Sequence, residues 1–357
     1  MYYFDWVTSL ISKVSFLILT LNLCFCTEFI SLKNRLLVPF YFKYGVSFGY
    51  NDNIYRFSDS EKNGQKINDY IGKSFTFDSA IIKPELKIIY TPYLTKNTTN
   101  FIFFASHTNF ANSIDKQKTY FSIRFDYKVR PYSWLKIGYK VGNNNFLRFF
   151  QDEDSPSNDF VKCIYDSENA YFNYSFKAYK KGFSKFEFSK INHFFNPSFT
   201  EFDLDINKVS FYHSHRFTNY YINLEFSNHY ANNNTFDNGM TSSAFDRSFD
   251  QNDIKLSIEK KNIEYLKNLV FGLKFSERIY SSNVESDPLH NGRMHAEYVF
   301  LISALKEFQK HTNIELKYSI RFRKTDSEFD WVESLKTFDD ISLMLKITRD
   351  IDIDLFY

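Results

Sequence analysis

The sequence predicts an all-β chain that closes into an antiparallel transmembrane β-barrel of about fourteen strands. The first reason is alternation. From Phe40 to Tyr50, every second residue is Phe, Tyr or Val, and the residues between them are mostly small or polar. Successive side chains of a strand point to opposite faces, so this segment is a ribbon with one apolar face. The same pattern returns over 121–129 and 314–322, and again in the last seven residues.

The second reason is composition. The chain has 357 residues, 24% of them charged, a net charge of +2 and 20% aromatic residues, including 43 Phe and 26 Tyr. The mean hydropathy of -0.40 is that of an ordinary soluble protein. A membrane barrel resolves this conflict, because only alternate residues meet lipid. Part of the Phe content is explicable by an AT-rich genome, but codon bias does not produce alternation.

Turn and loop residues divide the chain into hairpins, and the connections differ in length. The connections at 130–133 and 180–182 are tight, whereas those at 57–78, 149–167, 232–250, 282–293 and 326–337 are long and polar. We predict strands at 40–56, 79–93, 99–110, 119–130, 134–148, 168–179, 183–195, 203–216, 220–231, 251–261, 268–281, 294–307, 313–325 and 338–357. Twelve or sixteen strands are the alternatives. Candidates for an aromatic girdle at the lipid boundary are Tyr90, Tyr93, Tyr120, Tyr127, Trp134, Tyr220 and Tyr318, and ordinary contact with hydrocarbon is the alternative for each. Short periplasmic turns and long extracellular loops are typical of outer-membrane barrels, and strands this long disfavour a soluble β-sandwich.

Pro84 falls inside the predicted strand 79–93. Proline has no N–H to donate to the ladder, and a closed barrel has no free edge. We therefore expect a bulge at Pro84 or a strand that ends beyond the membrane.

The N-terminus predicts an export signal. Lys13 precedes a mostly apolar run that ends near Cys26 and is too short for a membrane helix. We assign residues 1–26 to a secretory signal peptide, 27–39 to a short periplasmic lead-in and 40–357 to the barrel. A lipoprotein signal that ends at Cys24 or Cys26 is the alternative, but the bulky residues Leu23 and Phe25 directly precede these cysteines. After cleavage only Cys163 remains, so no internal disulfide is possible.

The last strand ends on alternating apolar residues and an aromatic C-terminus, Ile351, Ile353, Leu355 and Tyr357. In this respect the chain resembles the β-barrel outer-membrane proteins of Gram-negative bacteria. Porin-like barrels are the broad match, and the barrel of surface lipoprotein assembly modifiers is a weaker one. The resemblance implies an outer-membrane location, contact with the lipid bilayer and lipopolysaccharide, and use of these four residues as the signal for the barrel-assembly machinery.

The polar parity of the predicted strands is basic. This parity carries sixteen Lys and Arg residues but only six Asp and Glu residues, an excess of ten positive charges, while the net charge of the whole chain is only +2. Basic side chains lining a narrow, wet pore favour anions. We predict a passive or substrate-biased pore for small, possibly anionic, solutes. The predicted pore-lining residues are Arg124, Lys128, Lys136, Lys140, Arg321 and Arg323. A non-transporting barrel that acts in surface display or assembly through its loops is the alternative, and cross-strand pairing of these charges is the plain structural explanation.

Nothing in the sequence indicates catalysis. His213 and His215 share one face, whereas Ser210 lies on the other, and His229 has Ser227 on its own face without an accompanying lipase motif. The histidine pair lacks a third metal ligand, and nucleotide-binding and nucleic-acid signatures are missing. We therefore expect no enzyme activity, cofactor, metal or nucleic acid, and a monomer.

Overall fold

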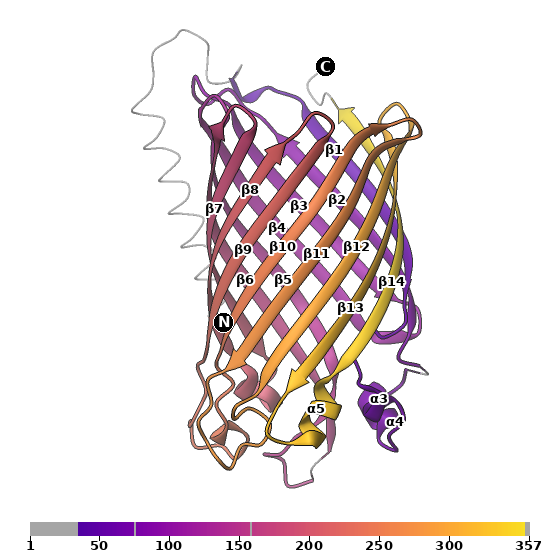
Figure 1. The fold of residues 1–357 in the computed structure, drawn as a ribbon, viewed down its shortest axis with the longest axis vertical. Helices are drawn as coiled ribbons and strands as arrows, with labels where there is room; N and C mark the ends of the chain where they lie inside the picture. Colours follow the sequence, from indigo (N-terminus) through magenta and orange to yellow (C-terminus); the bar gives the residue numbers. More distant parts are fainter. Residues whose placement is uncertain (1–34, 75, 158, 354–357) are drawn as a thin grey trace.

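The protein is a closed antiparallel barrel of fourteen strands, as predicted. This computed structural model describes residues 35–74, 76–157 and 159–353. Figure 1 shows the strands running obliquely around the barrel, where β1 pairs with β14 and so closes the sheet. The strands are β1 Phe40–Asn51, β2 Ser79–Tyr90, β3 Thr99–Phe110, β4 Ser113–Arg130, β5 Ser133–Gln151, β6 Phe160–Tyr179, β7 Gly182–Phe195, β8 Leu204–Arg216, β9 Tyr220–Asn233, β10 Phe249–Ile263, β11 Leu266–Tyr280, β12 Met294–Gln309, β13 Thr312–Asp326 and β14 Phe338–Ile353.

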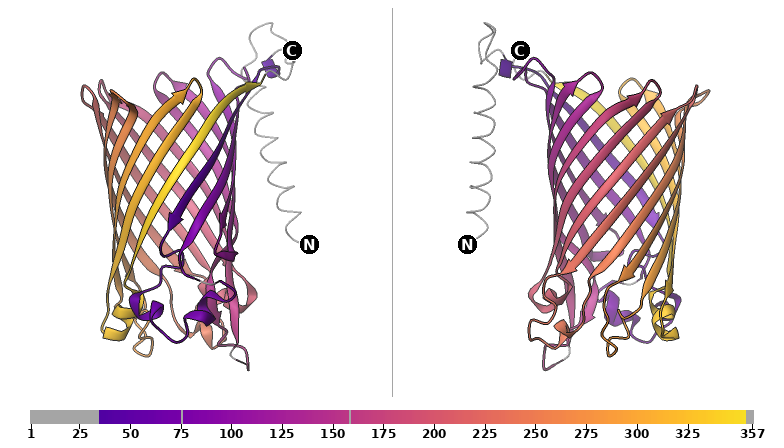
Figure 2. Two further views of the ribbon diagram at one scale, coloured as in Figure 1. Left: turned by 90° about the vertical axis from the view of Figure 1, so that its right-hand side faces the viewer. Right: turned by 60° about the vertical axis from the view of Figure 1, so that its left-hand side comes forward.

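The two ends of the barrel differ in their connections, which places the long loops outside the cell. Turns such as 131–132 and 180–181 join strands at the periplasmic end, where β1 begins. The long connections gather at the other end, which lies at the bottom of both views in Figure 2.

Two predicted loops are mostly strand. The segment 111–118 was expected to be a loop, but β4 already begins at Ser113, and most of 149–167 belongs to β5 and β6. Strand residues beyond the lipid layer need no apolar outer face, so the alternating signal disappears there although the ladder continues.

The outer wall is apolar on one parity of each strand. Ile123, Phe186 and Val209 are 62%, 50% and 56% exposed on this surface. The other parity faces the lumen, where small and charged residues such as Ser47 and Asp126 are buried. This parity also explains β12, because Tyr298 pairs with Phe275 and Phe322 on the lipid side, so His295 and Glu297 turn inward.

Several tyrosines predicted for the interfacial aromatic girdle share the lipid-facing parity, namely Tyr90, Tyr127, Tyr220 and Tyr318. Tyr120 and Trp134 do not, because they pair with Ser106 and Lys128 on the lumen side. Their assignment to the girdle is therefore wrong.

Pro84 interrupts one ladder without shifting it. It pairs with Val46 of β1, and β2 keeps a single register with β3 from the Ile82–Asn109 pair to the Glu85–Ser106 pair. Lys83 and Pro84 have no paired partner in β3. The missing N–H is accommodated by a gap in the ladder, so neither the expected bulge nor an early strand end occurs.

The predicted signal peptide lies outside the described residues, as do Leu355 and Tyr357 of the predicted assembly signal. Of the remaining two signal residues, Ile351 pairs with Phe42 and Ile353 with Phe40.

The helical elements are short and lie in the extracellular connections. They are α3 Asp59–Lys62, α4 Ile67–Ile71, η1 Pro197–Phe202, η2 Ser242–Ala244 and α5 Asp330–Lys336. Among the described residues, no helix has the length and apolarity needed to cross a membrane.

Candidate functional site: a basic cavity at the extracellular end

The connection between β1 and β2, residues 52–78, is called the first loop. It packs across the rim as far as β5 and β6. Tyr55 and Phe57 are buried with Phe146 in one apolar cluster, and the Tyr55 hydroxyl lies 2.5 Å from the Ser113 hydroxyl. The β3–β4 connection, residues 111–112, is short, so the first loop contacts β4 at its first residue, Ser113.

Polar contacts fix both ends of this crossing. Asn53 donates hydrogen bonds to the carbonyls of Phe57 and Asp339, both at 2.8 Å. On the far side, Glu61 pairs with Arg148, whose guanidinium also donates to the Tyr55 carbonyl. The first loop is thus tied to strands on both sides of the lumen.

The turn between these anchors presents Arg56 to the lumen. Arg56 has a φ of 57°, a left-handed conformation that non-glycine residues seldom adopt. Its side chain is exposed within the barrel. Partial desolvation by the enclosing wall, followed by repulsion from Arg321, lowers the pKa of Arg56 to about 10, so it is charged at neutral pH.

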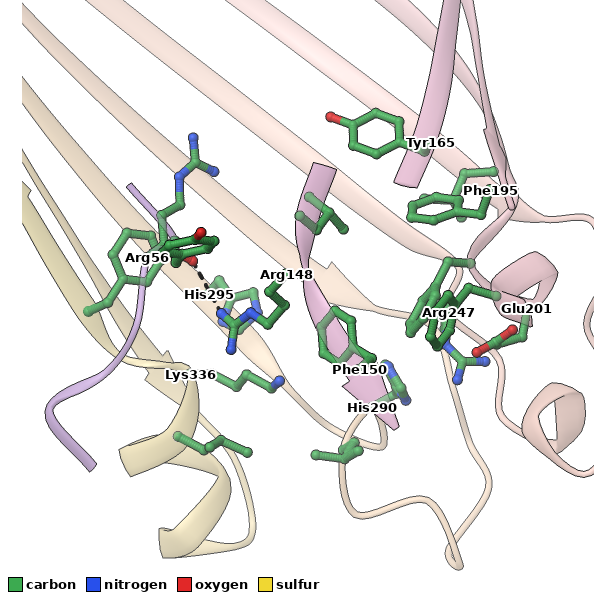
Figure 3. A pocket seen from close by; sticks show the side chains of 18 of the residues that line it. Arg56, Arg148, Phe150, Tyr165, Phe195, Glu201, Arg247, His290, His295 and Lys336 are labelled. Carbon is green, nitrogen blue, oxygen red and sulfur yellow. Dashed lines mark hydrogen bonds between the residues drawn. The ribbon is translucent and has the colours of Figure 1, made fainter. Parts of the chain in front are cut away.

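A cavity of about 520 Å³ lies beside Arg56 at this end of the lumen. Strands from nearly the whole circumference contribute to its lining, together with the first loop, η1 and α5. Figure 3 shows the basic side chains of Arg56, Arg148, Arg247 and Lys336 around it. Nine lining residues are basic and three are acidic. The basic residues are Arg56, Lys116, Lys118, Arg148, Arg247, Arg278, Arg293, Arg323 and Lys336, and the acidic ones are Glu61, Glu153 and Glu201.

Five arginines of this cavity stack on aromatic rings. The distances from the guanidinium carbon to the ring centre are 4.5 Å for Arg148 on Phe57, 4.6 Å for Arg247 on Phe202, 3.9 Å for Arg278 on Phe249, 3.9 Å for Arg293 on Tyr280 and 4.8 Å for Arg323 on Phe338. A stacked guanidinium is held by its face, which leaves the N–H groups at its edge available for an anion.

Three titratable groups in the extracellular connections adjust this charge. Burial raises the pKa of Glu201 to about 7, so part of its negative charge is lost at neutral pH. Burial also lowers the pKa of Lys336 to about 8. Burial lowers the pKa of His290 as well, and its Nδ1 lies 2.9 Å from an oxygen of Asp287.

The six predicted pore-lining residues all lie on the lumen parity, but they form two groups. Arg124, Lys128, Lys136 and Lys140 lie on β4 and β5 toward the periplasmic end, whereas Arg321 and Arg323 lie on β13 near the cavity. The two groups face the same lumen but lie on different strands of the barrel.

Their partners also differ. Arg124 pairs with Asp126 at 2.7 Å, and Arg323 pairs with Glu297 at 2.8 Å. Arg321 lies 3.7 Å from both Glu297 and Asp340. The ammonium of Lys140 lies 4.5 Å from the ring centre of Tyr171. Within the described chain, Lys128 and Lys136 form no ion pair. Cross-strand and same-strand pairing therefore accounts for half of the predicted set.

Sequence reasoning missed most of the cavity. Arg278 lies on a predicted strand and on its polar parity, so counting the basic residues of that parity could have found it. Lys116 and Lys118 fell in a segment predicted to be a loop. Arg56, Arg247, Arg293 and Lys336 lie in connections, and no sequence pattern identifies them.

The histidine candidates form local networks. On the outer wall, the Tyr179 hydroxyl lies 3.0 Å from Nε2 of His213 and 2.6 Å from Nδ1 of His215, and Nδ1 of His213 contacts Ser184. His229 lies in the lumen, where its Nε2 is 3.3 Å from Asp253. In the described part of the chain, no three His, Cys, Asp or Glu side chains gather in a way that holds a metal ion.

These observations define the class of protein. A closed fourteen-stranded barrel with an apolar outer wall, a charged lumen and long loops at one end is an outer-membrane β-barrel of porin-like architecture. It lies in the bacterial outer membrane and contacts the lipid bilayer.

The chain is similar in fold to solved structures of outer-membrane proteins. The channel DcaP of Acinetobacter baumannii is 10% identical, with a TM-score of 0.47 over 91% of this chain and all of that chain. The OmpT protein of Vibrio cholerae lacking loop L8 is 6% identical, with a TM-score of 0.46 over 87% and 98% of the two chains. An anion-selective porin from Comamonas acidovorans is also 6% identical, with a TM-score of 0.41 over 87% and 98%. These likenesses concern the barrel fold alone.

No protein-family model matches the sequence. No curated protein matches it either.

Proposed function

We propose that the protein is a passive or substrate-biased pore for small anionic solutes. One observation supports this above the others: the cavity at the extracellular end has six more basic than acidic side chains. A solute that enters the lumen from outside the cell passes this region first.

The physical basis is field focusing. The barrel wall and its lipid surroundings have a low dielectric constant, so the field of the basic side chains is concentrated in the wet lumen. Anions are then enriched at the entrance, and cations are depleted. Arg56 contributes from the first loop and the stacked arginines contribute from the wall, so charge surrounds the path.

Reversal potentials in planar bilayers test the proposal. With a potassium chloride gradient across the membrane, we expect a reversal potential whose sign shows that chloride permeates better than potassium. The double variant Arg56→Gln and Arg278→Gln should shift it toward zero, whereas the lipid-facing control Phe271→Ala should not. A cation-selective barrel would contradict the anion preference, and a barrel without conductance would favour the display or assembly role.

We also propose two partners from the family resemblance. Lipopolysaccharide would contact the outer wall, and the barrel-assembly machinery would bind the terminal strand with Ile351, Ile353, Leu355 and Tyr357. Deleting residues 354–357 should slow insertion into membranes that contain the machinery. Equal insertion rates of the full and truncated chains would contradict this role.

A further inference from the structure

We propose that the cavity contains a saturable site for a compact divalent oxyanion such as a phosphate group, formed by Arg293, Arg278 and Lys336 around the ring of Tyr280. This inference rests on the proposed anion pore, but it names a ligand class and a binding step that a merely anion-selective pore does not need.

Arg293 is the first reason. It lines the cavity although its side chain is only 4% exposed. It stacks on Tyr280 at 3.9 Å, and its buried Nε has no hydrogen-bond partner among the described residues. A buried guanidinium without a carboxylate partner is costly, and an anion would remove much of that cost.

The neighbouring cations are the second reason. Arg278 stacks on Phe249 at 3.9 Å, and Phe249 packs against Tyr280 with ring centres 5.9 Å apart. Two nitrogens of Arg278 donate to the same neutral oxygen, Oε1 of Gln251, so its charge is uncompensated by an ion pair in the described chain. Lys336 of α5 lines the same cavity and likewise forms no ion pair there.

The nearby carboxylates are occupied elsewhere. Asp287 binds His290, Glu297 binds Arg323, and Glu333 accepts a hydrogen bond from the Ser327 amide. Arg293 thus stacks on Tyr280, Arg278 stacks on the neighbouring Phe249, and Lys336 lines the same cavity. Within the described chain, none of the three forms an ion pair with a carboxylate. Two further rings, His290 and His295, lie 5.5 Å from Tyr280 and limit the free space.

Charge and geometry favour a divalent ligand. An ion with two negative charges gains about twice the Coulomb energy of a monovalent ion in the same field. Guanidinium groups also bind phosphate-type oxygens in a bidentate manner, which chloride does not allow. The site should therefore distinguish sulfate and phosphate from acetate and chloride.

Equilibrium binding to the full-length barrel in detergent tests the inference without requiring conduction. At constant ionic strength, calorimetric titration with inorganic phosphate and with sulfate should show saturable binding at one site. Acetate should bind at least roughly tenfold more weakly. Glycerol 3-phosphate is a further arm, since tighter binding than inorganic phosphate would identify an organic phosphate as the better ligand.

Arg293→Gln and Lys336→Gln should each weaken phosphate binding roughly tenfold, as expected for loss of one charge-assisted contact. Lys128→Gln, a lumen base near the periplasmic end, is the matched control and should leave binding unchanged. Lys336→Gln keeps the test valid if the Arg293 variant does not fold, and heat-modifiable gel mobility reports folding of all variants.

Equal binding of acetate and sulfate, or unchanged phosphate binding in Lys336→Gln, would overturn the site. Anion-selective conductance together with such a result would leave the proposed function intact. Conversely, the barrel could bind phosphate, lose that binding in the variants, and yet not conduct. That result would support the binding site and contradict the proposed pore.

Discussion

The two halves of the lumen hold their basic side chains in different ways. Toward the periplasm, bases lie beside acids on the same face of one strand, as in the pairs Arg124–Asp126 and Lys185–Glu187. At the extracellular end, arginines stack on aromatic rings, and several have no carboxylate in contact. Ion pairs thus neutralise part of the charge in the first region, whereas Arg278 and Arg293 in the second have aromatic partners in place of carboxylates. The number of bases on one strand face is therefore a poor measure of the field in the pore.

The first loop contributes to this difference. It brings Arg56, Tyr55 and Phe57 into the extracellular end, whereas the periplasmic turns at 131–132 and 180–181 are too short to fold inward. Aromatic rings support a guanidinium without cancelling its charge. Four tests separate the two regions, ordered by the size of the expected effect.

The largest effect should come from releasing the first loop. Phe57→Ala removes a fully buried ring from the cluster with Tyr55 and Phe146, a change that typically costs about 3–5 kcal/mol. We expect the loop to detach, single-channel conductance to rise and anion preference to fall. Phe271→Ala is the control, because that ring faces lipid and is 50% exposed. Identical conductance in both variants would show that the first loop does not shape the pore.

Neutralising one basic residue should affect ion selectivity more at the extracellular end of the lumen than at the periplasmic end. Arg56→Gln should lower the chloride-to-potassium permeability ratio by roughly twofold to fivefold, because Arg56 lines the cavity in which basic residues outnumber acidic ones. Lys136→Gln, the matched change near the periplasmic end, should alter the ratio less. Reversal potentials in the same salt gradient provide the measurement, and a larger effect of Lys136→Gln would reverse the comparison.

Acidity should affect the extracellular half alone. Burial raises the pKa of Glu201 to about 7, so this carboxyl loses its charge as the pH falls through that value. Lys336, whose pKa burial lowers to about 8, gains charge over a slightly higher range, so both changes make the cavity more positive. Anion preference should therefore increase between about pH 8 and about pH 6.

Glu201→Gln should remove the part of this increase below about pH 7. The same pKa shift makes folding stability depend on pH. Because the pKa of Glu201 is higher in the folded than in the unfolded protein, ionising Glu201 lowers the free energy of unfolding as the pH rises from about 4.5 to about 7. Denaturation of the wild type and Glu201→Gln at several pH values measures this. A pH profile of selectivity that is the same in both proteins would exclude Glu201 as its cause.

The smallest effect should follow from unpairing a periplasmic base. Asp126→Asn removes the acid that contacts Arg124 at 2.7 Å and leaves the positive charge of Arg124 uncompensated toward the periplasmic end of the lumen. We expect a slight rise in anion preference, below about twofold. A rise as large as the loss in Arg56→Gln would mean that pairing, rather than position along the lumen, determines the contribution of a base.

The comparison also shows how far the sequence was informative. Alternation at Phe40–Tyr50 and similar segments predicted the strands, their number and the lipid-facing parity, because each strand repeats the same local rule. It failed at Ser113 and Phe160, where strands continue beyond the lipid and the apolar parity ends. It also placed Tyr120 and Trp134 on the wrong face, since aromatic residues occur on both faces of this wall.

The sequence by itself determined the closed barrel and the basic parity of its interior, because period-two patterning and charge are properties of neighbouring residues. Only the tertiary structure decided which bases remain uncompensated. That outcome depends on contacts between distant segments, such as Arg148 with Glu61 and Arg293 with Tyr280, and on a loop whose path across the rim no local pattern specifies.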